Sequence, residues 1–307
     1  MRRSIKRKAF TMIELLFVIV ILGIVGGIAL EAVRQYYEGI YRTGEYSKRV
    51  AEADHILEQL SKYFENAISS SIVNLEASGS AHCYGPPTEG DTNDYTVAFI
   101  GVDQDSMRGI SGSRPGWSEE TLLGANNVIT AADADYTLAN SHMLAFGSTL
   151  LNSAIYDADS VDVGACARFR WSGAGTAGYH RIIDPTTATT LTLGTDNNAT
   201  NGKRKYLLRT GYAFRVNDNG EFIMYSRFRP WLGEYYTAAA RQNTLGRNVA
   251  HFYADYDASD FMANPELNDR GMVWRLKVCM RGIDTNLSES ESENQAICRE
   301  RRVHVRY

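Results

Sequence analysis

The chain opens with MRRSIKRKAFTMIELLFVIVILGIVGGIAL, residues 1–30, in which a basic leader, Met1 to Ala9, runs directly into an apolar segment, Phe10 to Leu30. This apolar segment has about 21 residues, which as a helix rising 1.5 Å per residue crosses the ~30 Å hydrocarbon layer of a membrane. Its one ionisable residue is Glu14. Because a carboxylate inside a membrane helix is costly, we expect Glu14 to have a specific partner.

Charge separates the leader from the rest of the chain. The leader holds five basic residues, and since the whole chain of 307 residues carries −4, the remainder carries −9. Basic residues before a membrane segment keep the N-terminus in the cytoplasm, so everything after Leu30 is expected to lie outside it. The acidic remainder of the chain argues against a general nucleic-acid binder, because such proteins contact the phosphate backbone with basic residues.

The helical pattern continues beyond the apolar segment. From Glu31 to about Ser70 there is no proline, and apolar residues recur mostly three, four or seven apart, at Val33, Tyr37, Ile40, Val50, Leu57, Leu60, Phe64 and Ala67. This spacing predicts one helix of roughly 60 residues, or ~90 Å. We expect its outer half to bury the apolar stripe on the chain's own globular domain and its inner half to pack on lipid or neighbouring helices.

Beyond Ser71 the period changes to short alternating runs, which predict an antiparallel sheet. The expected strands are Tyr95 to Gly101, Ala165 to Trp171, Thr189 to Leu193, Tyr206 to Val216, Glu221 to Phe228, Val249 to Tyr256, Met272 to Met280 and Ala296 to Tyr307. Asn219-Gly220 predicts a tight hairpin turn. The Gly, Ser, Ala and Asp-rich stretch 101–165 is interpreted as a long insertion with little regular structure, with a second small lobe as the alternative. The fold class is therefore α+β, with a leader at 1–9, a transmembrane half at 10–30, an amphipathic half at 31–70 and a sheet domain at 71–307.

Four cysteines lie outside the apolar segment, at Cys83, Cys166, Cys279 and Cys298. An oxidising periplasm permits disulfides, and four cysteines allow three connectivities. Cys279 and Cys298 fall on the more polar faces of the last two expected strands, which favours a bridge between them that contributes about 3 kcal/mol. Free thiols or a pairing centred on Cys83 remain the alternative.

No pattern points to catalysis, so we expect a protein that is not an enzyme and has no cofactor. The histidines lack metal-ligand spacing, no cysteines form C-x-x-C, and the Gly-Ser pairs lack the nucleophile elbow G-x-S-x-G. Asp157, Asp159 and Asp162 are the candidates for a calcium ion. Because the glycine and glutamate of an EF-hand loop do not follow them, solvated loop acids are the favoured interpretation.

The N-terminal residues resemble the class III leader of type IV pilins and type II secretion pseudopilins. The resemblance is carried by Phe10-Thr11-Met12-Ile13-Glu14 after the basic leader, and it implies cleavage by prepilin peptidase between Ala9 and Phe10 with N-methylation of Phe10. It also implies that Glu14 pairs with the α-amino group of a neighbouring subunit. Most members of the family have glycine where this chain has Ala9, and a plain membrane anchor whose Glu14 snorkels to the headgroups is the alternative.

A looser similarity covers about 40 residues of the C-terminal third, including Leu245, Asn248-Val249, Phe252 to Tyr256 and Val273 to Leu276. These residues are similar to J-type minor pseudopilins and W-type minor pilins, which implies a subunit at or near the filament tip that assists the initiation of assembly. The implied partners are other pilin or pseudopilin subunits, prepilin peptidase, the inner-membrane assembly platform and membrane lipid. The implied location is the bacterial inner membrane, with a single pass and a periplasmic globular domain, and then the pilus or pseudopilus.

Two other functions compete with this interpretation. A DNA-binding minor pilin of an uptake pilus would use basic residues alternating with aromatic ones, Arg204, Lys205, Arg209, Arg215, Arg227 and Arg229 with Tyr206, Tyr212, Phe214, Tyr225, Phe228 and Trp231. A membrane-anchored periplasmic enzyme would share only the leader. Asn198 and Asn286 are in addition candidate glycosylation sites, because each lies in N-x-[ST] with Asp two residues before it.

Overall fold

The computed structural model describes residues 11–76, 83–85, 95–108, 114–117, 123–124, 127–130, 133–157, 165–171, 179–194, 204–256, 272–282 and 295–305. The helices are α1 (Met12–Phe64), α2 (Gln104–Arg108), α3 (Tyr136–Phe146), α4 (Ala165–Arg168) and α5 (Tyr236–Ala239), with 3-10 turns η1 (Ser69–Ser71), η3 (Leu150–Asn152) and η4 (Pro230–Leu232). The strands are β1 (Val73–Glu76), β2 (Cys83–Gly85), β3 (Tyr95–Val102), β4 (Val128–Thr130), β5 (Ala154–Asp157), β6 (Tyr179–Thr187), β7 (Thr190–Leu193), β8 (Lys205–Val216), β9 (Phe222–Phe228), β10 (Arg241–Gly246), β11 (Val249–Tyr256), β12 (Met272–Met280) and β13 (Ile297–Val305).

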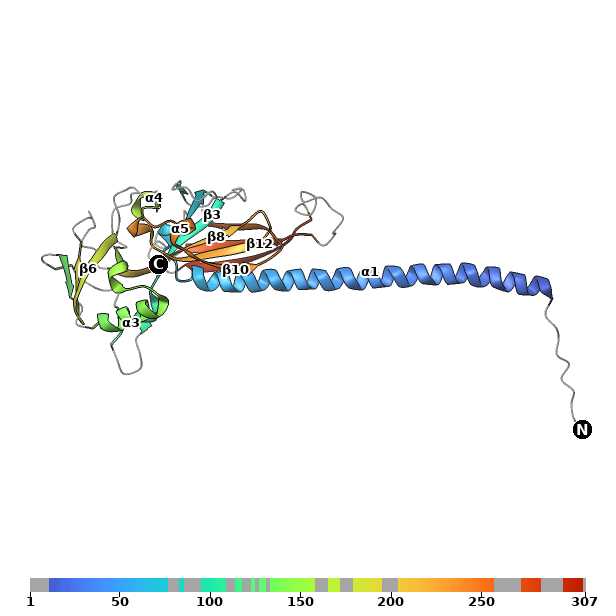
Figure 1. Cartoon of the computed structure of the whole chain (residues 1–307), viewed down its shortest axis with the longest axis horizontal. Coiled ribbons are helices and arrows are strands. Elements are labelled where there is room, and N and C mark those ends of the chain that lie inside the picture. Colours follow the sequence, from blue (N-terminus) through green and yellow to red (C-terminus); the bar gives the residue numbers. More distant parts are fainter. Residues whose placement is uncertain are drawn as a thin grey trace, which may run out of the picture. The chain divides into compact units, whose positions relative to one another are not determined.

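The predicted long helix is confirmed as α1, which is one uninterrupted element of 53 residues (Figure 1). It ends at Phe64, a few residues earlier than expected, because Ala67 already forms a β-bridge with Gly101 and a 3-10 turn follows at Ser69–Ser71. The chain divides into two compact parts, residues 1–49 and 50–307. The last turns of α1 thus belong to the second part, together with the sheets.

The described strands form an antiparallel sheet of ten strands, confirming the predicted α+β class. Strand β8 is its centre. On one side β8 pairs with β3 from Val97↔Phe214 onwards, and on the other it pairs first with β5 and then with β9. The strand order across the sheet is β2-β1-β3-β8-β5-β6-β7-β4, and β10 extends the sheet by pairing with β9. One 12-residue strand therefore organises most of the domain.

A second sheet of three strands in the order β11-β12-β13 comes from the C-terminal part of the described chain. The bounds of β11 and β12 coincide with the predicted strands Val249 to Tyr256 and Met272 to Met280. Alternate residues of β12, Trp274, Leu276 and Val278, are buried, as the period of two predicts for a strand with one face on a core.

The last turns of α1 share a core with strands of both sheets. Ile56, Leu60 and Phe64 are fully or almost fully buried and share a core cluster with Phe214 of β8 and Leu276 of β12. Their spacing of four residues places them on one helix face. The prediction that the outer half buries its stripe on the chain's own domain is therefore confirmed for these turns.

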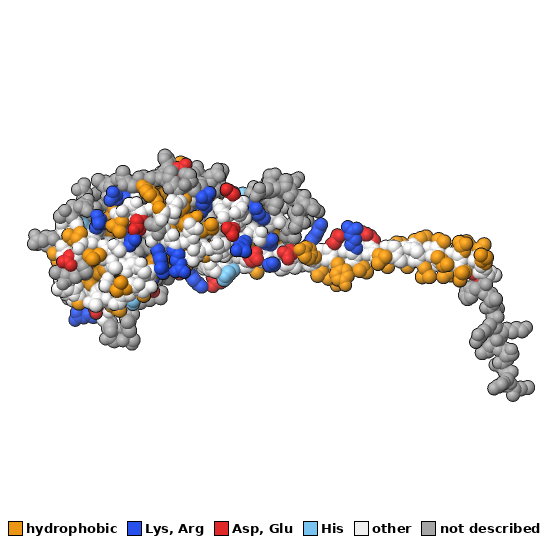
Figure 2. All heavy atoms as spheres, viewed as in Figure 1, with side chains coloured by type: hydrophobic (Ala, Val, Ile, Leu, Met, Phe, Trp, Pro, Cys, Tyr) orange, Lys and Arg blue, Asp and Glu red, His pale blue; other side chains and the backbone are white. Residues whose placement is uncertain are grey.

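The same prediction is wrong for the earlier part of that half. Val33, Tyr37 and Ile40 are exposed, whereas burial along α1 is concentrated from Ala53 onwards. Figure 2 shows a mixture of hydrophobic and charged side chains on the surface of this stretch. Periodicity identified the apolar face correctly but did not show where along the helix the chain's own core ends.

Two expectations for the middle of the chain are also wrong. The region 101–165, expected to have little regular structure, contains α2, β4, α3 and β5, and β5 is an interior strand of the large sheet. The expected strand Ala165 to Trp171 begins instead as the helical turn α4. Helix α3 has clear end signals that were overlooked, because Asp135 caps its first turn and Gly147 ends it with a φ of 89°.

The predicted hairpin joins β8 to β9. Gly220 has a φ of 73° and donates its N–H to the carbonyl oxygen of Asn217, while Asn217 donates to the carbonyl oxygen of Glu221. Gly220 therefore has a positive φ, whereas Asn219 does not. The loop is therefore a turn followed by a left-handed glycine rather than a two-residue loop with two positive φ values.

All four cysteines are paired, as Cys83–Cys166 and Cys279–Cys298. Cys279 lies directly opposite Cys298 in the β12–β13 register. The first bridge separates its cysteines by 83 residues and the second by 19.

Because a longer closed loop restricts the unfolded chain more, we expect the double variant Cys83→Ala/Cys166→Ala to lose about 4.5 kcal/mol of unfolding free energy. The double variant Cys279→Ala/Cys298→Ala should lose about 3 kcal/mol. Urea denaturation of both variants beside the wild type measures the difference. An equal or reversed order would contradict loop closure as the source of the stabilisation.

Candidate functional site

The N-terminus of α1 carries the residue singled out in the apolar segment. Glu14 lies in the first turn, and its Oε2 accepts hydrogen bonds from the backbone N–H and the hydroxyl of Thr11, each at 3.1 Å. Thr11 Oγ1 in turn accepts from the Glu14 N–H at 3.4 Å. This reciprocal arrangement is a capping box, which satisfies N–H groups that the first turn of a helix leaves without partners. Ala9 and Phe10, the predicted processing residues, lie outside the described residues.

The following part of α1 is long and apolar enough to cross a membrane, and it is the one helix of which this is true in the described part of the chain. Its side chains are exposed, among them Leu16, Phe17 and Ile21. Figure 2 shows hydrophobic side chains covering this N-terminal stretch. Apolar side chains of this number are stable in lipid or against other helices and unstable in water.

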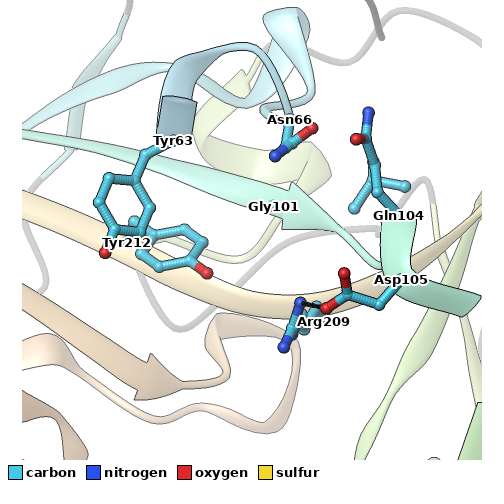
Figure 3. A pocket seen from close by; sticks show the side chains of 8 residues that line it. Tyr63, Asn66, Gly101, Gln104, Asp105, Arg209 and Tyr212 are labelled. Carbon is cyan, nitrogen blue, oxygen red and sulfur yellow. Dashed lines mark hydrogen bonds and ion pairs between the residues drawn. The ribbon is translucent and has the colours of Figure 1, made fainter. Parts of the chain in front are cut away.

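A small polar hollow of about 120 Å³ lies where α1 ends. Tyr63 and Asn66 come from the end of α1 and the turn after it, and Arg209 and Tyr212 come from β8; the rings of Tyr63 and Tyr212 lie side by side, and Arg209 lies beside Asp105 (Figure 3). Arg209 Nη1 is 2.6 Å from Oδ2 of Asp105, so the charges at its wall are already paired. Burial raises the pKa of Tyr212 to about 12, so this phenol is neutral at physiological pH.

A serine, a histidine and an aspartate meet near this hollow without forming a hydrolase triad. The Ser106 hydroxyl donates to Oδ2 of Asp103, and its oxygen is 3.3 Å from Nδ1 of His142. In a triad the imidazole lies between the hydroxyl and the carboxylate, and here the hydroxyl occupies that middle position. Ser106 is also fully buried, which keeps a substrate from reaching it.

Asp157, one of the three calcium candidates, is engaged by a lysine. Its side chain is 0% exposed, and its Oδ2 lies 3.8 Å from Nζ of Lys205, which is also 0% exposed. Asp159 and Asp162 lie outside the described residues. Among the residues that the structure describes, no group of three or more His, Cys, Asp or Glu side chains is placed to hold a metal ion.

His180 is a third buried ionisable residue beside this pair. Burial lowers its pKa from the ordinary 6.5, the nearby Asp157 opposes the shift and Lys205 adds to it. The neutral imidazole is therefore the form that the folded protein favours.

We expect the unfolding free energy to fall as the pH drops below 6.5. Between the lowered pKa of His180 and 6.5 the unfolded chain binds more protons than the folded one, so stability rises with pH in that window. Urea denaturation at pH 7.5, 6.5 and 5.5 measures this, with His180→Asn as the control that lacks the group. An equally steep fall in the variant would assign the dependence to other residues.

The basic and aromatic residues of the DNA-binding alternative do not form an exposed stacking surface. Phe214, Phe228 and Trp231 are almost completely buried, and Tyr206 and Tyr225 nearly so. Bases stack on aromatic rings only where those rings face solvent. Four of these rings lie on β8 and β9, whereas Trp231 lies in the 3-10 turn η4, and both faces of β8 are covered.

The two candidate glycosylation residues, Asn198 and Asn286, lie outside the described residues. Thr11 was missed as a partner of Glu14, although the spacing T-x-x-E is a sequence signal for a capping box. The trio of Asp157, His180 and Lys205 was missed for another reason, since it depends on the register of three strands far apart in sequence.

Comparison with known proteins yields one match. Residues 5–30 match the family model described as the prokaryotic N-terminal methylation motif. No curated protein and no solved structure matches the chain. The matched segment contains the second half of the basic leader, with Lys6, Arg7 and Lys8, as well as Glu14 and the apolar beginning of α1. The chain thus carries a type IV pilin-like leader, joined directly to a helix able to cross a membrane.

Proposed function

We propose that this chain is a minor pilin or pseudopilin, a non-enzymatic structural subunit that its N-terminal helix inserts into a type IV pilus or a type II secretion pseudopilus. One observation carries the proposal. The methylation motif runs without interruption into α1, and Glu14 is the one ionisable residue of the apolar segment. This combination needs a partner charge at membrane depth, and a neighbouring subunit with a newly released α-amino group supplies one.

The capping box explains how the carboxylate is tolerated before assembly. In the single chain Glu14 accepts its hydrogen bonds from Thr11 of its own helix. On assembly it pairs with the α-amino group of Phe10 of a neighbour, and two charges that are costly in lipid neutralise each other. Assembly thereby exchanges local hydrogen bonds for an intermolecular ion pair.

The exposed part of α1 supports the same partners. Val33, Tyr37 and Ile40 are exposed on a stretch that interleaves charged residues with apolar ones. In a filament this stretch packs against the helices of other pilin or pseudopilin subunits, while the segment before it contacts lipid or those helices in the membrane. Prepilin peptidase and the inner-membrane assembly platform are the further partners of the proposal.

We place the subunit at or near the tip, as in J-type pseudopilins and W-type minor pilins, where it assists the initiation of assembly. The support is the size of the part after residue 50, whose described strands form one sheet of ten and another of three. A domain this large suits a position that few copies occupy better than a closely repeated shaft. The chain is proposed to cross the bacterial inner membrane once, with the N-terminus in the cytoplasm and the sheets in the periplasm.

Fractionation of sheared filaments tests this function. Cells that express the tagged chain should release it with the filament fraction, and deletion of its gene should reduce the number of filaments or the secretion of their substrates. A chain confined to the membrane fraction, together with a deletion that leaves both properties unchanged, would favour a plain anchor.

Processing gives a separate prediction. N-terminal sequencing of the membrane-extracted protein should begin at Phe10 and find it N-methylated. Ala9→Gly should be processed at least as completely as the wild type, whereas Ala9→Glu should accumulate the precursor, because a charged side chain is costly in a pocket that accepts small residues. A wild-type chain that keeps its first nine residues would contradict the proposal.

A further inference from the structure

Asp157 and Lys205 face each other across neighbouring strands inside the sheet domain. They are register partners in the β5–β8 pair, and their charged atoms are 3.8 Å apart with neither side chain exposed to solvent. Removing two charges from water costs several kcal/mol for each ion, and their attraction offsets this only in part. The site therefore favours any process that removes both charges while keeping the two side chains together.

His180 joins this pair from the strand on the other side of β5. It is the register partner of Ile155, which shares a strand face with Asp157 because the two are two positions apart along β5. The Nε2 of His180 is buried and has no hydrogen-bond partner among the described residues. An imidazole held neutral by burial has a free lone pair, so it can take up a proton and return it.

We propose that Lys205 and Asp157 become joined by an intramolecular amide bond between Nζ and the side-chain carbonyl carbon Cγ. In the first step a proton passes from the ammonium group to the carboxylate, giving a neutral amine and a carboxylic acid. The Nζ lone pair then attacks Cγ and forms the C–N bond. His180 takes the remaining excess proton from nitrogen and delivers it to the departing hydroxyl, which leaves as water with the C–O bond broken.

The balance of this reaction is one amine and one carboxylic acid converted to one amide and one water, so no oxidant or cofactor is needed. Groups that a fold holds in the right orientation reach effective concentrations of up to about 10⁵ to 10⁸ M, and neighbouring strands hold Asp157 and Lys205 together in this way. The product is neutral, which removes the cost of two desolvated charges. Because the site is closed to solvent, the water needed for the reverse reaction is scarce once the first one has left.

The bond would tie β5 to β8, the strand on which most of the large sheet is organised. It is independent of the two disulfides, so it would survive reduction. The inference does not depend on the proposed filament function, since it concerns only the interior of the sheet domain.

Peptide mapping of the full-length wild-type protein, extracted from its native membrane in detergent and reduced, tests the proposal. Tryptic digestion should give a branched peptide that joins the segments containing Asp157 and Lys205, lighter by one water than the two linear peptides together. Trypsin should also fail to cleave after Lys205. Recovery of both segments as linear peptides, with cleavage after Lys205, would overturn the proposal and leave an ordinary buried ion pair.

Two variants make the assignment specific. Lys205→Arg keeps the positive charge but lacks the primary amine, so its digest should contain no branched peptide. Asp157→Asn should give the same branched peptide, because the amide releases ammonia in place of water. A branched peptide that persists in Lys205→Arg would also overturn the proposal, and the wild-type measurement decides the question even if either variant fails to fold.

Discussion

Glu14→Ala is expected to reduce incorporation of the subunit into filaments by at least ~30-fold, which corresponds to the loss of about 2 kcal/mol of pairing free energy. The variant lacks the carboxylate that would meet the α-amino group of the next subunit. It should still reach the membrane, because the apolar side chains of α1 are unchanged. Quantitative immunoblotting of the sheared-filament and membrane fractions measures the ratio.

Two control variants separate pairing from other roles of Glu14. Glu14→Gln retains an acceptor for the Thr11 N–H and hydroxyl but carries no charge, so it should behave like Glu14→Ala. Glu58→Ala removes an exposed carboxylate from the last turns of the same helix, away from the stretch proposed to contact other subunits, and should assemble normally. If Glu14→Gln assembled as well as the wild type, Glu14 would act as a helix cap and the ion pair would be excluded.

Phe64→Ala is expected to lower the unfolding free energy of the sheet domain by about 3 to 5 kcal/mol. Phe64 is completely buried at the end of α1, and its ring centroid lies 4.6 Å from that of Phe99 and 6.1 Å from that of Phe214. Truncation leaves a cavity at the place where the helix meets the strands. Denaturant melts followed by tryptophan fluorescence measure the loss, because Trp274 shares this core cluster.

Lys62→Ala is the matched control for this substitution. Lys62 lies on the exposed side of the same helical turn and forms an ion pair with Glu58 at 3.3 Å. Exposed pairs of this spacing contribute about 0.3 to 0.5 kcal/mol, so the variant should be nearly as stable as the wild type. Comparable losses in both variants would mean that the loss in Phe64→Ala does not come from packing in the core, since both substitutions introduce alanine, the best helix former.

Much of the fold could be predicted because its signals are local. The apolar segment, the absence of proline and the spacing of Leu57, Leu60 and Phe64 define α1, and period-two alternation defines β11 and β12. The candidate site at Glu14 is local as well, since its partner Thr11 is three residues away. Short-range geometry alone is enough to specify such features.

The wrong predictions fall where long-range contacts override local preference. Ala165 to Trp171 has the composition of a strand, yet it begins with the helical turn α4. Phe169 and Trp171, which follow this turn, are buried in a core cluster. Strand β5 is only four residues long and becomes part of the sheet through pairing with β6 and β8. A short apolar run is compatible with several structures, and its neighbours in space select one of them.

Sequence by itself determined the membrane-length helix, the pilin-like leader and the position of Glu14, because each depends on one continuous stretch of the chain. Tertiary structure alone decided how far along α1 the core extends, that Cys83 is joined to Cys166, and that Asp157, His180 and Lys205 share one buried face. The physical reason is register: a shift of one residue in a strand moves its side chains to the opposite face, and no local pattern specifies that shift for strands so distant in the chain.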